Sequence, residues 1–159
     1  MHKQALVEKI VAHLTGELQR YAQAARVAQA GATDGESRAE NKYDTRGLEA
    51  SYLAHGQSRQ ALDTGQARDQ FAALTPRAFA AQEPIGLGAL VTLESQGEAF
   101  CYFIGPSAGG MEVVHEGTEV LVLTAQSPLG RQLIGRRAGE RLRISLGGPP
   151  QDYQVVSVV

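Results

Sequence analysis

Tryptophan is absent from this chain of 159 residues, and cysteine occurs once, at Cys101. One cysteine cannot form a disulfide within a single chain, and its place in an apolar run predicts a buried structural thiol rather than part of a zinc site. Apolar runs long enough to span a bilayer are also missing, as is an apolar leader segment. We therefore expect a soluble cytoplasmic protein.

The chain also has no large excess of charge of one sign, because it contains 15 Lys and Arg and 17 Asp and Glu, for a net charge of −2. Overall charge therefore indicates no particular partner. The sequence contains no phosphate-binding glycine loop, nucleophile elbow or dinucleotide-binding glycine pattern. The sequence therefore offers none of these three nucleotide-binding or catalytic patterns.

Two stretches have the pattern of long helices, residues 2–30 and about 39–74. The first stretch has one face of apolar residues that repeats every seven positions and is interrupted by Glu17. The residues of this face are Val7, Ile10, Leu14, Tyr21, Ala24 and Ala28. Three glycines weaken the second stretch, each by roughly 1 kcal/mol relative to alanine, so it needs the first helix as a partner.

The segment Gly31–Asp44 lies between these stretches and contains the helix-breaking residues Gly31 and Gly35. A short break between two helices predicts the tip of an antiparallel hairpin, with the turn inside Gly31–Ala39. The segment also holds four acids, Asp34, Glu36, Glu40 and Asp44. Two interpretations stay open. The acids are part of a solvated turn, or the hairpin is a rod that carries these carboxylates to a site where they act.

After residue 83 the period of the apolar residues changes from that of helices to that of strands. Six short strands are expected, at residues 87–93, 99–104, 111–114, 119–123, 141–146 and 153–158. Ser127 and Pro128 predict the capped start of a short helix that reaches Ile134. The sequence thus predicts an α+β protein, with a helical hairpin at 1–83 and a mostly antiparallel sheet with one helix at 84–159.

Residues 84–159 contain five arginines and no lysine, and every arginine lies after Gly130. Arg131, Arg136 and Arg137 surround the predicted short helix. They predict a basic surface. Cations are also common at the solvated C-terminal end of a helix, where the helix dipole stabilises them.

The segment Ser127–Glu140 is similar to the C-terminal signature of the Gre family of bacterial transcript-cleavage factors. That signature reads Ser-Pro-Leu, a small residue, a helix, glycine, two basic residues and a Val/Ala-Gly-Asp/Glu turn. The segments Ile85–Val91 and Phe103–Pro106 also resemble the C-terminal domain of that family, so the resemblance covers nearly all of 84–159. At the expected tip, Glu40, Asn41 and Tyr43 resemble the Glu-Asn pair and nearby Tyr of the family.

The resemblance implies a coiled-coil hairpin followed by an FKBP-like domain, and a monomeric accessory factor that binds RNA polymerase. The hairpin of such a factor enters the secondary channel, so that contact with RNA and DNA is indirect. Its tip acids help to hold a magnesium ion shared with the polymerase, and no cofactor is bound by the isolated protein. Carried to this chain, Glu36 and Glu40 would be the metal-holding acids, with Asp34 as a substitute. Arg131, Arg136, Arg137, Ser127 and Pro128 would contact the polymerase.

One position departs from the family pattern, because Ser37 stands where the family has an acid three residues before Glu40. Glu36 and Glu40 would lie one helical turn apart and could replace the usual pair. The departure keeps a second hypothesis open, a channel-binding regulator without cleavage activity that resembles the Rnk or DksA proteins. A third, a prolyl isomerase suggested by the FKBP-like fold alone, is disfavoured because aromatic residues are few.

Overall fold

The computed structural model describes residues 2–33, 46–145 and 147–159. The chain divides into two compact units, Val11–Asp69 and the combination of Met1–Ile10 with Gln70–Val159. The first unit is helical, and the second holds a six-stranded sheet with one short helix. The predicted α+β class is therefore confirmed.

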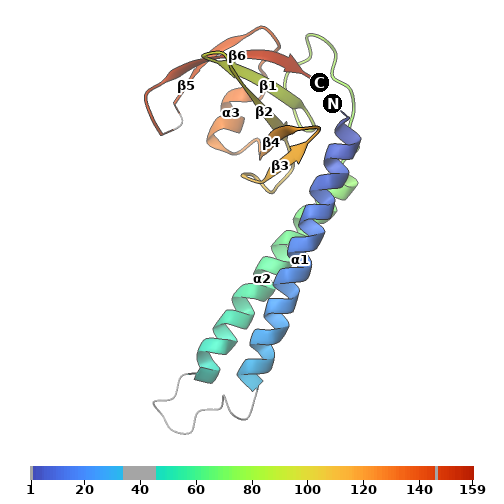
Figure 1. Ribbon diagram of the computed structural model, residues 1–159, viewed down its shortest axis with the longest axis vertical. Coiled ribbons are helices and arrows are strands. Elements are labelled where there is room, and N and C mark those ends of the chain that lie inside the picture. Colours follow the sequence, from blue (N-terminus) through green and yellow to red (C-terminus); the bar gives the residue numbers. More distant parts are fainter. Residues whose placement is uncertain (1, 34–45, 146) are drawn as a thin grey trace. The chain divides into compact units, whose positions relative to one another are not determined.

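The helical unit consists of most of α1 (Lys3–Thr33) and α2 (Arg46–Ala73), which run side by side in opposite directions (Figure 1). Leu14, Ala25 and Ala28 are buried on α1. A Cβ atom built on Gly65 of α2 would lie 3.6 Å from the Leu18 side chain, an ordinary packing distance. Small residues of both helices thus lie at the contact together with two leucines, which suits a chain that is poor in large apolar side chains.

The buried stripe of α1 differs in one respect from the predicted one, because Ala25 rather than Ala24 is buried. Leu18, next to Glu17, is half-buried, whereas Ala28 is buried as predicted. Glu17 instead lies beside His13, with 3.6 Å between His13 Nε2 and Glu17 Oε1. After the charged residue at a predicted apolar position, the buried stripe thus differs from the prediction by one residue at Ala25, which a fixed seven-residue count does not capture.

The ends of the helices lie close to the predicted ones where the structure describes them. α1 continues through Gly31 to Thr33, three residues past the expected end, and α2 ends at Ala73. The expected start of the second helix near residue 39, and most of the expected turn, lie outside the described residues.

The sheet has the strand order β3-β4-β2-β1-β6-β5. Its strands are β1 (Leu90–Ser95), β2 (Glu98–Ile104), β3 (Glu112–His115), β4 (Thr118–Leu123), β5 (Arg141–Ile144) and β6 (Gln151–Val158). All six predicted strands are present, and neighbouring strands are antiparallel as expected with one exception, the parallel pair of β2 and β4. The chain passes from β2 to the edge strand β3 and returns as β4 between them, so β4 runs in the same direction as β2.

The core of this unit lies where α3 (Pro128–Leu133) packs on the sheet. Leu129 and Leu133 of α3 join buried strand residues such as Val91 and Ile104. The beginning of α1 belongs to the same unit, and its buried side chains are those of Leu6, Val7 and Ile10.

The end of α2 and the edge of the sheet are also part of this unit. The ring of Phe71, at the end of α2, lies 6.3 Å from that of Phe103 in β2. Lys9 Nζ donates to the Val114 carbonyl at 2.7 Å, which occupies a backbone acceptor of the edge strand β3.

Two sequence-based expectations concern single features of the chain. The thiol of Cys101 in β2 is free, as expected, but it is half-buried rather than buried, and its Sγ lies 3.8 Å from Thr92 Oγ1 on the neighbouring strand. Over the residues described, neither long helix contains a stretch apolar enough to cross a bilayer.

Candidate functional site

The segment after β4 begins with a capped helix. Ser127 Oγ accepts from the Gly130 backbone N–H at 3.0 Å and donates to the Thr124 carbonyl at 2.8 Å. Pro128 occupies the first turn, where its missing N–H costs no hydrogen bond. The Ser-Pro start of α3 thus has a local physical cause, and the predicted cap at Ser127 is confirmed.

Glycine at position 130 is required by close contact with the backbone. A Cβ atom there would lie 1.9 Å from the Thr124 carbonyl oxygen and 2.7 Å from Ser127 Oγ. The side chains on either side, Leu129 and Arg131, face opposite environments, because Leu129 is buried and Arg131 is exposed. The first turn of α3 is therefore held against the chain before it, with Arg131 at the surface.

The chain after α3 is fixed at two glycines in the left-handed region. Gly135, at φ +84°, donates to the Ile85 carbonyl at 2.9 Å, and Ile85 donates to the Arg136 carbonyl at 2.7 Å. Gly139, at φ +89°, donates to the Val155 carbonyl at 2.7 Å. These bonds tie the turn that carries the two adjacent arginines to the segment before β1 and to β6.

The three arginines around α3 differ in their contacts. Arg136 lies 3.3 Å from Glu140, and the Arg137 guanidinium donates to the Gln82 carbonyl. The Arg131 guanidinium makes no hydrogen bond or ion pair with any residue that the structure describes. All three side chains are exposed, so the fold brings the predicted contact residues to the surface around one short helix. Arg131 is the one most available to a partner.

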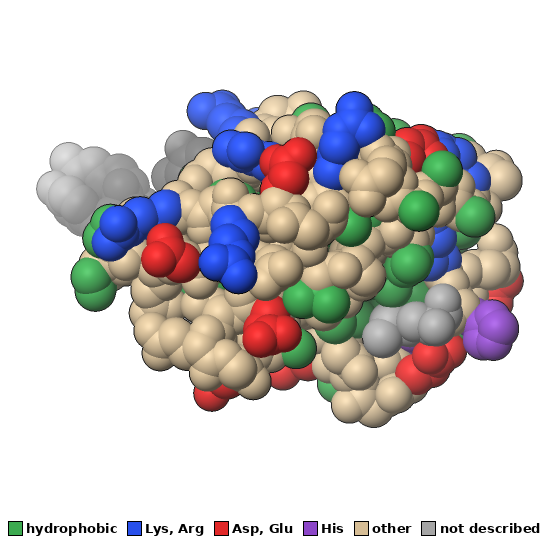
Figure 2. Space-filling model, turned by 90° about the horizontal axis from the view of Figure 1, so that it is seen from above, with side chains coloured by type: hydrophobic (Ala, Val, Ile, Leu, Met, Phe, Trp, Pro, Cys, Tyr) green, Lys and Arg blue, Asp and Glu red, His purple; other side chains and the backbone are tan. Residues whose placement is uncertain are grey.

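The basic side chains do not form a continuous surface on the face seen in Figure 2. Lys and Arg side chains alternate there with acidic and apolar ones. No Lys or Arg occurs between Arg77 and Arg131 in the sequence, so the Lys and Arg of the sheet unit are those of its N-terminal helical part, Arg77 and the five arginines after Gly130.

The predicted tip residues Asp34, Glu36, Glu40, Asn41 and Tyr43 lie outside the described residues, as does Ser37. Their arrangement stays a prediction. Within the residues that are described, no three His, Cys, Asp or Glu side chains lie together in a way that could hold a metal ion.

One cluster, which no sequence pattern indicated, joins the start of α1 to the segment after α2. The Lys3 ammonium and the Arg77 guanidinium lie 4.7 and 4.0 Å from the centre of the Phe79 ring. Arg77 also pairs with Glu83 at 2.5 Å, and this hydrogen bond is the main reason why the pKa of the Glu83 carboxyl is lowered. Burial lowers the pKa of Lys3. The proximity of these residues depends on tertiary structure, since Lys3 and Arg77 are far apart in the sequence.

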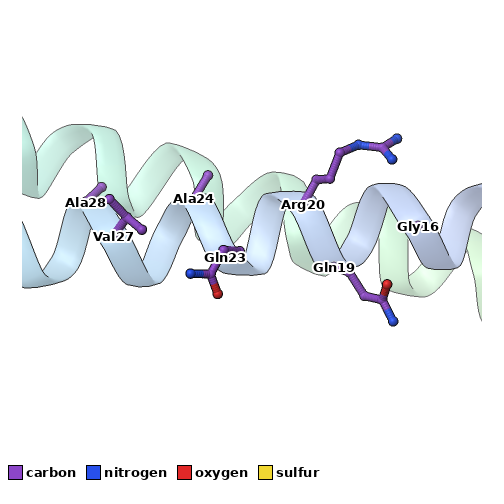
Figure 3. A pocket seen from close by; sticks show the side chains of 7 residues that line it. All are labelled: Gly16, Gln19, Arg20, Gln23, Ala24, Val27 and Ala28. Atoms are coloured by element: carbon purple, nitrogen blue, oxygen red, sulfur yellow. The ribbon is translucent and has the colours of Figure 1, made fainter.

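One groove in the helical unit runs along α1, with a volume of about 720 Å³ (Figure 3). Its lining is mainly apolar, with small residues and Val27 beside polar ones, including Gly16, Ala24 and Gln23. Arg20 is the one ionisable side chain among the described residues of its lining. The groove thus offers no pair of groups for acid–base or nucleophilic chemistry.

No protein-family model matches the sequence, and no curated protein matches it. Several solved structures are similar to the chain. Gfh1 of Thermus aquaticus is 24% identical over 95% of this chain and 92% of its own, with a TM-score of 0.41. Gfh1, GreA factor homolog 1, of Thermus thermophilus is 20% identical over 94% of each chain, with a TM-score of 0.39. The transcription elongation factor GreA/GreB of Nitrosomonas europaea is 17% identical over 60% of this chain and 78% of its own, with a TM-score of 0.38. Likenesses this distant assign no family, and the function must be inferred from the residues themselves.

Proposed function

We propose that this chain is a transcription elongation factor of the Gre type, which binds RNA polymerase and stimulates cleavage of backtracked RNA. The observation that carries the proposal is the signature Ser127–Glu140, in which the residues shared with the family lie in one surface segment. The chain would be an accessory factor, with the nuclease chemistry performed by the polymerase.

Docking on the polymerase would involve the outer side of α3. Arg131 is exposed there, while Leu129 and Leu133 are buried in the core, so the signature presents a fixed surface. Arg136 and Arg137 extend the surface, although each is partly engaged by an acceptor within the fold. Arg131 would contribute most, because its guanidinium gives up no intramolecular partner on binding.

This docking surface can be tested with a matched pair of charge reversals, Arg131→Glu and Arg143→Glu. Both residues are exposed, and Arg143 lies on the edge strand β5, 3.8 Å from Asp152, on the strand face opposite to Leu142 and Ile144, which pack in the core with α3. We expect Arg131→Glu to weaken binding to core polymerase, with a smaller dependence on salt than the wild type. Equal affinity of the two variants would show that the arginine at α3 is solvated surface.

The paired helices would carry the tip into the secondary channel. At 1.5 Å per residue, α1 alone is about 46 Å long, and a helix pair is only about 20 Å wide. The tip carboxylates Glu36 and Glu40, with Asp34 as a substitute, suit magnesium, which prefers carboxylate oxygen and keeps several waters. A visiting carboxylate can help to retain a second ion at a polymerase site that already holds one.

Incubation with a stalled, backtracked elongation complex and Mg²⁺ tests the proposal directly. Shortened RNA would support the cleavage function, and replacement of both Glu36 and Glu40 by Ala should then abolish cleavage and leave polymerase binding nearly intact. Ser37→Asp should raise the activity, because it restores the spacing of acids found in the family. Cleavage that persists in the double variant would exclude these two acids as the metal-holding pair.

A second candidate function is favoured by one observation, the serine at position 37. A channel-binding regulator resembling the Rnk or DksA proteins would occupy the channel and need no acid there. Binding without cleavage, by both the wild type and Ser37→Asp, would support this function. Failure to bind polymerase at all would overturn both candidates.

A further inference from the structure

A second groove lies on the sheet, and no residue of the signature lines it. It has a volume of about 400 Å³ and is formed by strands β2, β3 and β4. Two aromatic residues, one leucine and two acids line most of it: Phe100, Tyr102, Leu121, Glu112 and Glu119. Neither the capped start of α3 nor its arginines belong to this groove, so the proposed function does not use it.

Strand register places these five side chains on one face of the sheet. Tyr102 is opposite Leu121, and Leu121 is opposite Glu112. Phe100 precedes Tyr102 by two residues and Glu119 precedes Leu121 by two, and side chains two apart on a strand point to the same face. The groove is thus a property of the sheet itself rather than of a loop.

The aromatic part of the groove is held in place by the core. Tyr102 is only 7% exposed, and Phe100 meets the Tyr153 ring edge-on with 6.1 Å between the ring centres. Phe100 and Leu121 are half-buried and pack against the core cluster. A ligand would therefore meet a preformed apolar surface and would not have to order it.

The acidic part of the groove has no counterion within the fold. Glu112 and Glu119 are exposed, and neither carboxylate forms a hydrogen bond or ion pair with the residues that the structure describes. No Lys or Arg occurs between Arg77 and Arg131, so acids are the charged residues of strands β1 to β4. Lys9 reaches the edge strand β3, but its ammonium is bound to the Val114 carbonyl.

We propose that this groove binds a short segment of a partner protein in which a lysine or arginine lies beside an apolar side chain. The cation would lie near the aromatic rings and between two carboxylates, an arrangement that stabilises ammonium and guanidinium groups. The neighbouring apolar side chain would pack on Leu121 and Phe100. The same carboxylates repel phosphate, so a nucleic acid does not fit here.

The inference is tested on the full chain, labelled with ¹⁵N, by NMR titration with three capped peptides. The probes are Ala-Leu-Lys-Leu-Ala, the same peptide with Glu in place of Lys, and the same peptide with Ala in place of both Leu. We expect the first peptide to shift amide signals of residues 100–102, 112 and 119–121, and the other two to bind at least about tenfold more weakly.

Charge reversal provides the matched variants. The double variant Glu112→Lys, Glu119→Lys should bind the first peptide at least about tenfold more weakly than the wild type. Glu94→Lys is the control, because Glu94 is exposed in the same sheet and its register opposite Ala99 places it on the other face. Its affinity should stay within about twofold of the wild type.

Several outcomes would overturn the inference. Signal changes spread over the whole chain, or equal binding of the peptides with Lys and Glu, would show that the groove does not select a cation. Unchanged binding by the double variant would place the site elsewhere. Equal binding of spermidine, which carries ammonium groups without apolar side chains, would show that the groove does not recognise a protein segment.

Discussion

Replacement of Gly130 by alanine should destabilise the sheet unit, although alanine is the better helix former. Helix propensity alone would favour alanine by about 1 kcal/mol. The added Cβ would lie 1.9 Å from the Thr124 carbonyl oxygen and 2.9 Å from its carbon, and backbone atoms cannot turn away as a side chain can. Relief requires the first turn of α3 to move away from Thr124.

The magnitude depends on the contacts that this movement breaks. Overpacking against a rigid neighbour costs up to about 3 kcal/mol. Loss of the Ser127 cap, whose Oγ the new methyl group would also crowd at 2.7 Å, costs about 1 kcal/mol more. After the gain in helix propensity is subtracted, the free energy of unfolding should fall by about 3 kcal/mol. For a domain of about 100 residues, this lowers the melting temperature by roughly 12–24 °C.

Differential scanning calorimetry of the full chain measures this effect. Gly86→Ala is the control in the same unit, because a Cβ atom at Gly86 would meet nothing within 4 Å. We expect that variant to melt within a few degrees of the wild type. If Gly130→Ala melts at the temperature of the control, α3 does not press against the Thr124 carbonyl, and the physical reason given for this glycine is wrong.

Three further predictions concern the same unit. Burial raises the pKa of Tyr102 above its ordinary 10.0, so the folded state favours the neutral phenol and loses stability as the pH rises past about 10. Urea unfolding from pH 8 to 11 should therefore show a smaller alkaline loss for Tyr102→Phe than for the wild type. Phe71→Ala should lower the free energy of unfolding by about 3–5 kcal/mol, because Phe71 is fully buried against Phe103, and a loss below about 1 kcal/mol would contradict that packing. Ser127→Ala should cost about 1 kcal/mol by urea unfolding, through the bond from the Gly130 amide, and an unchanged midpoint would contradict the cap.

Local signals in the sequence predicted the elements of the fold well. Ser127 and Pro128 mark the start of α3 through bonds to their immediate neighbours, so the sequence is enough to find them. The first strand begins at Leu90, later than expected, because Gly88 at φ +82° is part of a turn. Such a difference of a few residues arises because glycine fits either a strand end or a turn.

Features that depend on distant residues could not be predicted in this way. The parallel pair of β2 and β4 depends on the path of the chain around β3, and alternation of apolar residues is the same in parallel and antiparallel strands. The requirement for glycine at 130 depends on how α3 folds back onto the Thr124 carbonyl. At the site, exposure of the arginines could be expected from their charge, whereas the partners of Arg136 and Arg137 could not.

The inclusion of the start of α1 in the sheet unit has a consequence for the order in which the chain can fold during synthesis. Lys9 and the carbonyl that it binds are separated by 105 positions, and β1 pairs with the last strand, β6. Residues 11–69 form a compact unit of their own, so the helical unit can form once α2 has been made. Leu6, Val7 and Ile10 belong to the unit that contains the strands, so their burial is complete only when that unit has formed. We therefore expect the start of α1 to expose apolar side chains on the nascent chain during most of its synthesis. Chaperones that act at the ribosome should bind this exposed segment.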